Sequence, residues 1–304
     1  MRPILVTGGS GQLATALEAA SGDRALCRVG RPGFDFDRPA SLTETVAQVM
    51  PALVVNTAAW TAVDAAESEP EAAARANRDG PAEMARLCAE AGIPLIHIST
   101  DYVYDGAKGA PYVETDRPHP TGVYGTTKLA GEQAALATWK RTLVLRTAWV
   151  YGATGKNFVR TMLSAGRRAA TSGTPLRVVA DQRGCPTAAA DLAAAVLAVA
   201  DRISEGWRDE YGGVFHAAGS GATTWHGLAC ATFAAAAQYG GPQPEVLPIS
   251  TADWPTPARR PADSRLDCTK LAAVFGHRLP EWGDGLTRTI AAIFQAEAAA
   301  RAPV

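Results

Sequence analysis

The feature that most constrains the fold lies at the start of the chain. Residues 3–7 (Pro-Ile-Leu-Val-Thr) form a short apolar run, which is typical of a strand buried on both faces of a parallel sheet. Gly8, Gly9 and Gly11 follow at once, and a helical pattern continues to Ala20. This order lets the backbone approach a pyrophosphate and present a helix N-terminus to its charge. A glycine turn without a ligand is the alternative, but the position between strand and helix favours a dinucleotide site.

The alternation of strand and helix continues through the first half of the chain. Short apolar runs at 25–29, 53–56, 95–100 and 142–147 predict further strands, separated by segments with helical periodicity. Such alternation implies right-handed crossovers and a parallel sheet with helices on both faces. We therefore predict an α/β fold, a Rossmann-type doubly wound parallel sheet with a smaller α/β C-terminal cap that binds the substrate.

The pattern loosens in the second half of the chain. We expect residues 1–152 to form the dinucleotide-binding domain, and later segments at about 176–200 and 213–217 to contribute to it. Residues 153–304 should form mainly the substrate-binding cap, interleaved with the first domain.

Composition narrows the choice of partners. A net charge of −1 over 304 residues gives no electrostatic footprint for nucleic acid or an anionic membrane. The five cysteines are scattered without a Cys-x-x-Cys pair, so neither a disulfide framework nor a zinc site is indicated and no metal is assigned. The alanine-rich tract 188–200 is interrupted by Asp191 and is too short for a membrane span. We expect a cytoplasmic protein that binds a small molecule, with no nucleic-acid or membrane partner.

Candidate cofactor contacts lie at the carboxyl ends of the first strands, where open parallel sheets bind ligands. An NAD enzyme would place an acid after the second strand, but Arg28 and Arg31 stand there, and guanidinium groups pair well with a 2′-phosphate. Asp35 and Asp37 offer carboxylates that can instead accept from the adenine amine. This pattern favours NADPH, with NADH as a second option. The expected cofactor contacts are Gly8, Ser10, Gly11, Gln12, Leu13, Arg31, Asp35, Phe36, Ala58, Ala59, Trp60, Asn77, Tyr124 and Lys128.

A tyrosine and a lysine four residues apart supply the candidate chemistry. Tyr124 and Lys128 fall at the start of a helix that follows the proline-rich segment 117–120, so they share one face. A cation one helical turn away is expected to lower the pKa of Tyr124, which makes proton transfer to a carbonyl oxygen feasible. On spacing alone, an accidental pair at an exposed helix start is the alternative. Thr100, at the end of the strand 95–100, faces the same crevice and can bond a substrate oxygen.

Together the glycine turn, Thr100 and the Tyr124/Lys128 pair resemble the extended short-chain dehydrogenase/reductase superfamily. Within it the chain resembles the dTDP-4-dehydrorhamnose reductase family, whose successive sequence blocks are matched in order by residues 56–64, 99–106, 124–132, 146–152, 181–187 and 260–264. The block at 99–106, Ser-Thr-Asp-Tyr-Val-Tyr-Asp-Gly, is the most diagnostic. Trp60 and Ala14 depart from the family pattern, which usually has tyrosine and often glycine there.

This resemblance implies NAD(P)H-dependent reduction of the C4 keto group of dTDP-4-dehydro-L-rhamnose to dTDP-L-rhamnose, a precursor of cell-surface polysaccharide. It implies that Tyr124 gives its proton to the C4 oxygen, that Lys128 holds the nicotinamide ribose, and that Thr100 bonds the substrate oxygen. The implied substrate contacts are Thr100, Asp101, Tyr102, Trp149, Asn157 and Arg260. Some family members are described as dimers bridged by a metal through glutamates. Those glutamates are not matched here, so we leave a homodimer open and assign no metal.

Two other hypotheses stay open. The chain could be another nucleotide-sugar 4-keto-reductase or epimerase of the same superfamily. It could also be a non-catalytic nucleotide-binding subunit, like the regulatory subunit of methionine adenosyltransferase, which keeps the fold. The intact set of Thr100, Tyr124 and Lys128 favours an enzyme.

Overall fold

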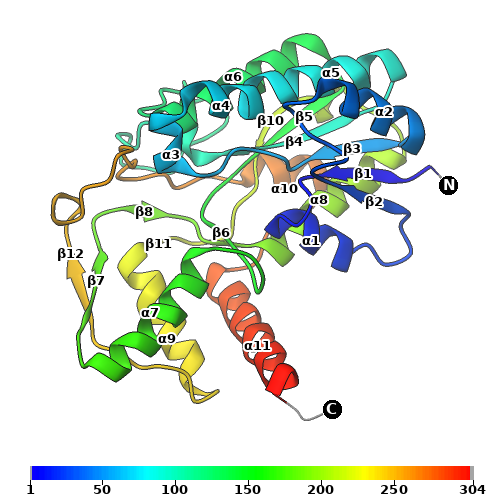
Figure 1. Ribbon diagram of the computed structural model, residues 1–304. Helices are drawn as coiled ribbons and strands as arrows, with labels where there is room; N and C mark the ends of the chain where they lie inside the picture. The colour runs from blue at the N-terminus through cyan, green and yellow to red at the C-terminus, as the bar shows by residue number, and fades with distance from the viewer. Residues whose placement is uncertain (1, 302–304) are drawn as a thin grey trace.

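A computed structural model describes residues 2–301 of the chain (Figure 1). Within these residues a sheet of six parallel strands has the order β10-β5-β4-β3-β1-β2. This arrangement confirms the predicted doubly wound α/β fold. The strands are β1 (Ile4–Thr7), β2 (Leu26–Val29), β3 (Leu53–Asn56), β4 (Leu95–Thr100), β5 (Thr142–Thr147) and β10 (Gly213–His216).

Helices cover both faces of the sheet, as the continuously apolar strands require. Alternate strand residues face opposite sides, so Leu5 and Val54 pack with the helices of one face while Val6 and Val55 pack with those of the other. The first face carries α2 (Pro39–Val49), α5 (Gly80–Ala91) and α6 (Val123–Thr138), and the second carries α1 (Gln12–Ala19), α8 (Ala189–Ser204) and α10 (Thr269–Phe275).

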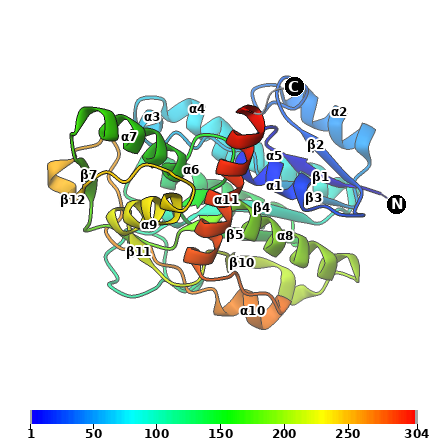
Figure 2. The same ribbon diagram turned by 90° about the horizontal axis from the view of Figure 1, so that it is seen from below.

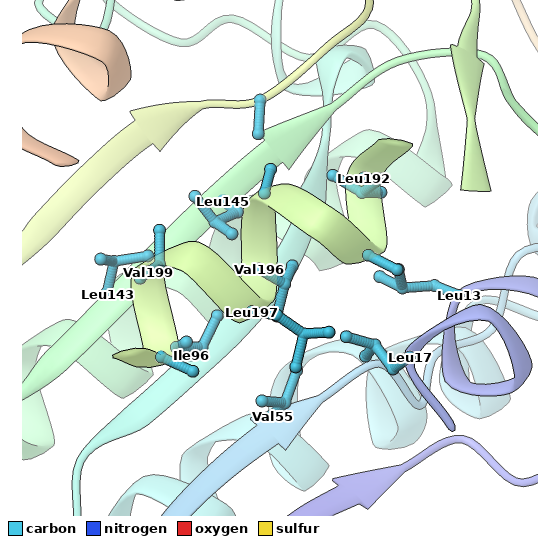
Figure 3. Close-up of a cluster of buried hydrophobic side chains, with 14 of the residues drawn as sticks. Leu13, Leu17, Val55, Ile96, Leu143, Leu145, Leu192, Val196, Leu197 and Val199 are labelled. Atoms are coloured by element: carbon cyan, nitrogen blue, oxygen red, sulfur yellow. The ribbon is translucent and has the colours of Figure 1, made fainter. Parts of the chain in front are cut away.

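The core on the second face of the sheet is formed by apolar side chains of the strands and of α1, α8 and α10. Figure 3 shows Leu17 of α1 and Val196 of α8 lying over Val55 of β3. All three side chains are at most 1% exposed, and full burial of each contributes about 1.5–3 kcal/mol. This packing fixes α1, and with it the glycine turn at its N-terminus.

The segment from residue 70 to residue 91 is helical but contains a π-helical turn. α4 (Pro70–Ala74) passes through the turn at Arg75–Asp79 into α5, and the short helix α3 (Val63–Ser68) precedes them. The π turn lies against α6, and a Cβ atom on Gly131 of α6 would overlap the carbonyl oxygen of Asn77. Glycine at 131 therefore lets α6 approach the turn closely.

The remaining elements form a smaller region beside the carboxyl ends of the strands (Figure 1). Its core joins three helices through apolar residues such as Leu163, Leu228 and Ile290. Figure 2 shows α11 lying between the α7/α9 pair and α1. The helices are α7 (Phe158–Ser172), α9 (Trp225–Ala237) and α11 (Trp282–Arg301), and the short strands pair as β7 (Leu176–Val179) with β12 (Val246–Ile249), β8 (Arg183–Gly184) with β11 (Thr223–Thr224), and β6 (Val150–Tyr151) with β9 (Thr187–Ala188). Single 3₁₀ turns occur at Asp101–Val103, Asp209–Tyr211 and Thr251–Asp253.

The later segments assigned to the first domain contribute unequally. β10 joins the central sheet beside β5, and α8 packs on α1. β7, however, pairs with β12 in the smaller region and does not join the six-stranded sheet. A short apolar strand does not encode its partner, so the sequence pattern could not show this pairing. The division into two domains at residue 152 stays a prediction. No helix within residues 2–301 is long and apolar enough to span a membrane.

Replacement of Gly131 by alanine tests the close contact between α6 and the π turn. Alanine normally stabilises a helix more than glycine does, but at position 131 its Cβ would overlap the carbonyl oxygen of Asn77. We therefore expect Gly131→Ala to lower the free energy of unfolding by about 1–3 kcal/mol. Gly283, in α11, has open space around its Cβ position, so Gly283→Ala should be neutral or stabilising by about 0.5–1 kcal/mol. Denaturant unfolding measures both. An unchanged stability in Gly131→Ala would contradict the packing described.

Candidate active site

A polar chain across the central strands positions the loop after β3. The Thr7 hydroxyl donates to the Asn56 side-chain oxygen at 2.6 Å, and the Asn56 amide nitrogen lies 3.1 Å from Nδ1 of His97. All three residues are fully buried. Burial lowers the pKa of His97 well below its usual value, so the ring is neutral. The Asn56 oxygen also accepts from the backbone N–H of Ala58 at 3.2 Å, which fixes the loop that carries Ala58, Ala59 and Trp60.

The glycine turn has the geometry of an anion-binding loop. Gly8 has a φ of 108°, and a Cβ there would overlap the Thr57 hydroxyl. α1 begins after Gly11, which has no side chain to cap it, so the first N–H groups of the helix are available to an anion. Gln12 and Leu13 lie in this first turn. The Leu13 side chain is part of the core, so only its backbone N–H can serve a pyrophosphate. These features fit the predicted dinucleotide.

The two arginines after β2 differ in availability. Arg28 donates to the carbonyl oxygen of Gly9 at 2.8 Å and forms an ion pair with Glu18 at 2.9 Å. Its guanidinium therefore supports the glycine turn, and its pairing with a 2′-phosphate stays a prediction. Arg31 is exposed, as are Asp37 and its ion-pair partner Arg75.

Two of the predicted contact residues, Asn77 and Asn157, hold neighbouring segments in place. Asn77 is fully buried, and its amide bonds the backbone N–H and C=O of Trp60 and the hydroxyl of Thr127. Asn157 caps α7 through Arg160 N–H and donates to the side-chain oxygen of Gln12 at 2.9 Å. Both ends of each amide are engaged within the protein, so each side chain fixes a segment beside the expected crevice. Direct contact of Asn77 with the cofactor and of Asn157 with the substrate stays a prediction.

Thr100 and Asp101 form a buried pair at the end of β4. The Thr100 hydroxyl donates to the Asp101 carboxylate at 3.0 Å and accepts from the backbone N–H of Tyr102 at 3.2 Å. Asp101 is 1% exposed. Burial raises the pKa of Asp101 to about 6, against the opposing effect of hydrogen bonds from Ser264 and Thr100. Oδ2 of Asp101 lacks a hydrogen-bond partner within residues 2–301.

Tyr124 lies in the first turn of α6, beside this pair. Its ring meets the edge of the Tyr102 ring at a centroid distance of 5.5 Å and an interplanar angle of 75°. Burial raises the pKa of Tyr124 to about 12, hydrogen bonding to Thr100 lowers it in part, and the charge of Asp101 raises it. The net shift is therefore upward, because burial outweighs any stabilisation of the phenolate by Lys128, and the predicted lowering of the Tyr124 pKa is wrong. The phenol is held in its protonated form at neutral pH.

The ammonium of Lys128 is hydrogen-bonded to the backbone of β4. Its ammonium donates to the carbonyl oxygen of Ile98 at 2.7 Å, and the side chain is 2% exposed. Burial lowers the pKa of Lys128 to about 8, while the charge of Glu132 one helical turn later opposes this shift. A cation is thus kept in a site that water scarcely reaches.

One helical turn after Lys128, Glu132 forms a buried ion pair with Arg146 that the sequence analysis did not predict. Arg146 of β5 and Glu132 of α6 are 3% and 1% exposed and bond in a bidentate manner, with the shortest contact at 2.6 Å. Arg146 also donates to the hydroxyl of Tyr104 at 2.7 Å, and this hydroxyl lies 2.9 Å from Nε2 of His216. Burial lowers the pKa of His216 to about 3. The one sequence feature that could have indicated this pair is a charged residue inside each of two otherwise apolar segments.

Trp149, just before β6, has an unusual backbone conformation and a closely packed ring. Its φ of 48° is unusual for a residue with a side chain, and a Cβ on Gly184 would overlap its ring. The ring stacks on Trp225 with centroids 3.5 Å apart and an angle of 6°. Trp225 in turn donates to the side-chain oxygen of Gln182 at 3.1 Å. Trp225 was not predicted from the sequence.

Arg260 is held by a partner that was not anticipated. Its two terminal nitrogens bond the two carboxylate oxygens of Asp64, each at 2.8 Å, and one of them also donates to the carbonyl oxygen of Ala258 at 3.0 Å. A guanidinium has five N–H donors, so the Nε–H and one Nη–H are left for a ligand as far as residues 2–301 are concerned. The side chain is 20% exposed.

Comparison with known proteins assigns the family. The model of the RmlD substrate binding domain matches residues 1–294. A dTDP-4-dehydrorhamnose reductase of Sinorhizobium fredii is 45% identical over 95% of this chain and 97% of its own, and the one of Escherichia coli K12 is 39% identical over 96% and 98%.

The chain belongs to the dTDP-4-dehydrorhamnose reductase family. Solved structures agree. A reductase of this family from Clostridium acetobutylicum has a TM-score of 0.87 at 33% identity and covers 95% of this chain and 98% of its own. One from Bacillus anthracis, solved in complex with NADP, has a TM-score of 0.86 at 30% identity, covering 95% and 99%.

The raised pKa of Asp101 predicts how the stability of the protein depends on pH. Because the folded-state pKa is raised, the carboxyl group favours the fold below its ordinary pKa, and this contribution is lost as the pH rises through about 6. Asp101→Asn cannot ionise, so it should raise the free energy of unfolding relative to wild type by about 1–3 kcal/mol at pH 8 and by less at pH 5.

Denaturant unfolding at the two pH values checks this expectation. Asp23→Asn is a matched control, because Asp23 is exposed, and it should leave the pH dependence unchanged. A difference between wild type and Asp101→Asn that is the same at both pH values would contradict it.

Proposed function

We propose that the protein is an NADPH-dependent oxidoreductase that reduces the C4 keto group of dTDP-4-dehydro-L-rhamnose to dTDP-L-rhamnose. One observation carries the proposal: Thr100, Tyr124 and Lys128 meet at the end of β4 and the start of α6, in a chain of the dTDP-4-dehydrorhamnose reductase family. The intact set favours an enzyme over a purely regulatory binding subunit.

The cofactor site supports a nicotinamide dinucleotide. The uncapped start of α1 offers N–H groups to the pyrophosphate, and exposed Arg31 offers a guanidinium to a 2′-phosphate. The relative from Bacillus anthracis binds NADP, which favours NADPH here, with NADH as a second option. When bound, the reduced nicotinamide supplies the hydride that reduces the carbonyl carbon. Lys128 would hold its ribose.

The residues of the chain manage the proton. Hydride addition leaves negative charge on the C4 oxygen, and an alkoxide is a stronger base than a phenolate. Tyr124 is protonated at neutral pH, since its pKa is raised to about 12, so it can donate its O–H proton to that oxygen. The Thr100 hydroxyl can donate a hydrogen bond to the same oxygen by turning from Asp101. The buried charge of Lys128 stabilises the phenolate that remains.

The substrate-side residues support a nucleotide-linked sugar. Asp101 and Tyr102 border the reacting oxygen, Trp149 offers an aromatic face, and Arg260 retains donors for a diphosphate. The assignment of these side chains to the sugar, the base and the diphosphate is part of the proposal. A homodimer and a cytoplasmic location also belong to it, and the mass of the protein in solution tests the first.

The experiment that tests the function follows NADPH oxidation with a panel of nucleotide-linked 4-keto-sugars. Turnover should be highest with dTDP-4-dehydro-L-rhamnose. Tyr124→Phe removes the transferable proton, so it should lower kcat by roughly 10²–10⁴-fold with little change in cofactor affinity. Lys128→Met should impair both kcat and cofactor binding. Wild-type turnover in Tyr124→Phe would exclude the proposed proton donor, and a better substrate in the panel would replace the proposed one.

A second prediction concerns the diphosphate contact of Arg260. Loss of one charge-assisted hydrogen bond should raise KM for the dTDP-linked sugar by roughly one to two orders of magnitude in Arg260→Ala, with NADPH binding unchanged. Arg259→Ala is the matched control, because Arg259 is exposed next to it and should alter KM little. Steady-state kinetics with both variants measure this. Equal KM values in wild type and Arg260→Ala would mean that Arg260 serves only to bind Asp64.

A further inference from the structure

The helix that carries Tyr124 begins without a cap of its own. Its N-cap residue is Gly122, which has no side chain, and Tyr124 is the second residue of α6. The first N–H groups of a helix have no intrahelical acceptor. The position of this first turn therefore depends on an acceptor from elsewhere in the chain.

Glu67 supplies that acceptor. Its carboxylate oxygen Oε1 accepts from the backbone N–H of Val123 at 2.8 Å, across 56 residues of sequence. A Cβ on Gly122 would lie 2.7 Å from the same oxygen, so glycine at 122 gives the carboxylate room to reach the helix. A carboxylate at a helix N-terminus is also favoured by the helix dipole.

Glu67 belongs to α3, which is itself tied to the substrate side. Asp64, on the same short helix, bonds Arg260 and accepts from the backbone N–H of Ala258 at 3.2 Å. The two acids of α3 thus contact two separate parts of the site: Glu67 the catalytic helix, and Asp64 the loop 258–260. α3 also packs directly on α6.

We propose that Glu67 is a positioning residue for Tyr124, acting through the N-terminal turn of α6. The phenol oxygen must stay within hydrogen-bond reach of Thr100 and of the reacting oxygen, and a displacement of about 1 Å can cost about 10²-fold in rate. Further along α6, Lys128 and the Glu132–Arg146 pair hold the helix. Loss of the Glu67 contact would therefore loosen the first turn while the rest of the helix stays in place. This inference rests on the proposed role of Tyr124.

Kinetics of Glu67→Ala and Glu67→Gln test the proposal. Alanine removes the acceptor, so kcat should fall roughly tenfold while KM for NADPH stays within about twofold. Glutamine retains an acceptor oxygen at the same reach, so it should restore kcat to within about threefold of wild type. Glu69→Ala, at an exposed glutamate two residues along, is the matched control and should behave as wild type. Wild-type kcat in Glu67→Ala, or equal damage in Glu67→Gln, would overturn the proposal.

Gly122→Ala provides a second route that leaves the carboxylate in the protein. Its Cβ would displace Oε1 from the helix, so kcat should fall in the same direction as in Glu67→Ala even if that variant folds poorly. A wild-type kcat in Gly122→Ala would count against the inference.

Tyr124→Phe distinguishes failure of the proposed function from failure of the role proposed for Glu67. If it keeps full turnover, the assignment of the proton donor fails. If it is inactive while Glu67→Ala and Gly122→Ala are unimpaired, the role of Glu67 alone is rejected.

Discussion

The arrangement of the site depends on how closely α6 lies against the chain around it. Glycines at 125 and 131 face the Tyr102 carbonyl and the Asn77 carbonyl, where a Cβ would overlap the oxygen in each case. The buried pair of Glu132 and Arg146 then ties the helix to β5 at the centre of the sheet. Removal of one partner would leave an uncompensated charge in the interior. Close packing and a buried ion pair together fix the face that presents Tyr124 and Lys128.

Water exclusion acts in opposite directions on the ionisable groups of this face. Burial lowers the pKa of Lys128 and raises the pKa of Asp101 and of Tyr124, since it disfavours the charged form of each. Burying the charged forms of Asp101 and Lys128 lowers the stability of the fold. The same low polarity strengthens every hydrogen bond that a reacting oxygen would receive. The site thus accepts a stability cost in exchange for stronger hydrogen bonds in an environment with little water.

Much of the fold could be predicted from the sequence because its information is local. Each central strand is a continuous apolar run followed by a turn, and that pattern specifies burial on both faces whatever the partner. The spacing of Tyr124 and Lys128 specifies a shared helix face in the same way. Partners distant in sequence could not be predicted: Asp64 and Arg260 are 196 residues apart, and β7 has the same apolar pattern as a central strand. Nor does spacing show burial, which decides the direction of the Tyr124 pKa shift.

The two asparagines show a related limit. Asn77 and Asn157 stand near the expected crevice, and their amides could serve a ligand or the backbone equally well. In the structure Asn77 bonds the Trp60 loop and Asn157 caps the start of α7. A buried polar residue that fixes a loop near the site can be replaced as little as one that touches the ligand, because all of its donors and acceptors must find partners. Sequence pattern alone therefore identifies the neighbourhood of the site more readily than the side chains that face into it.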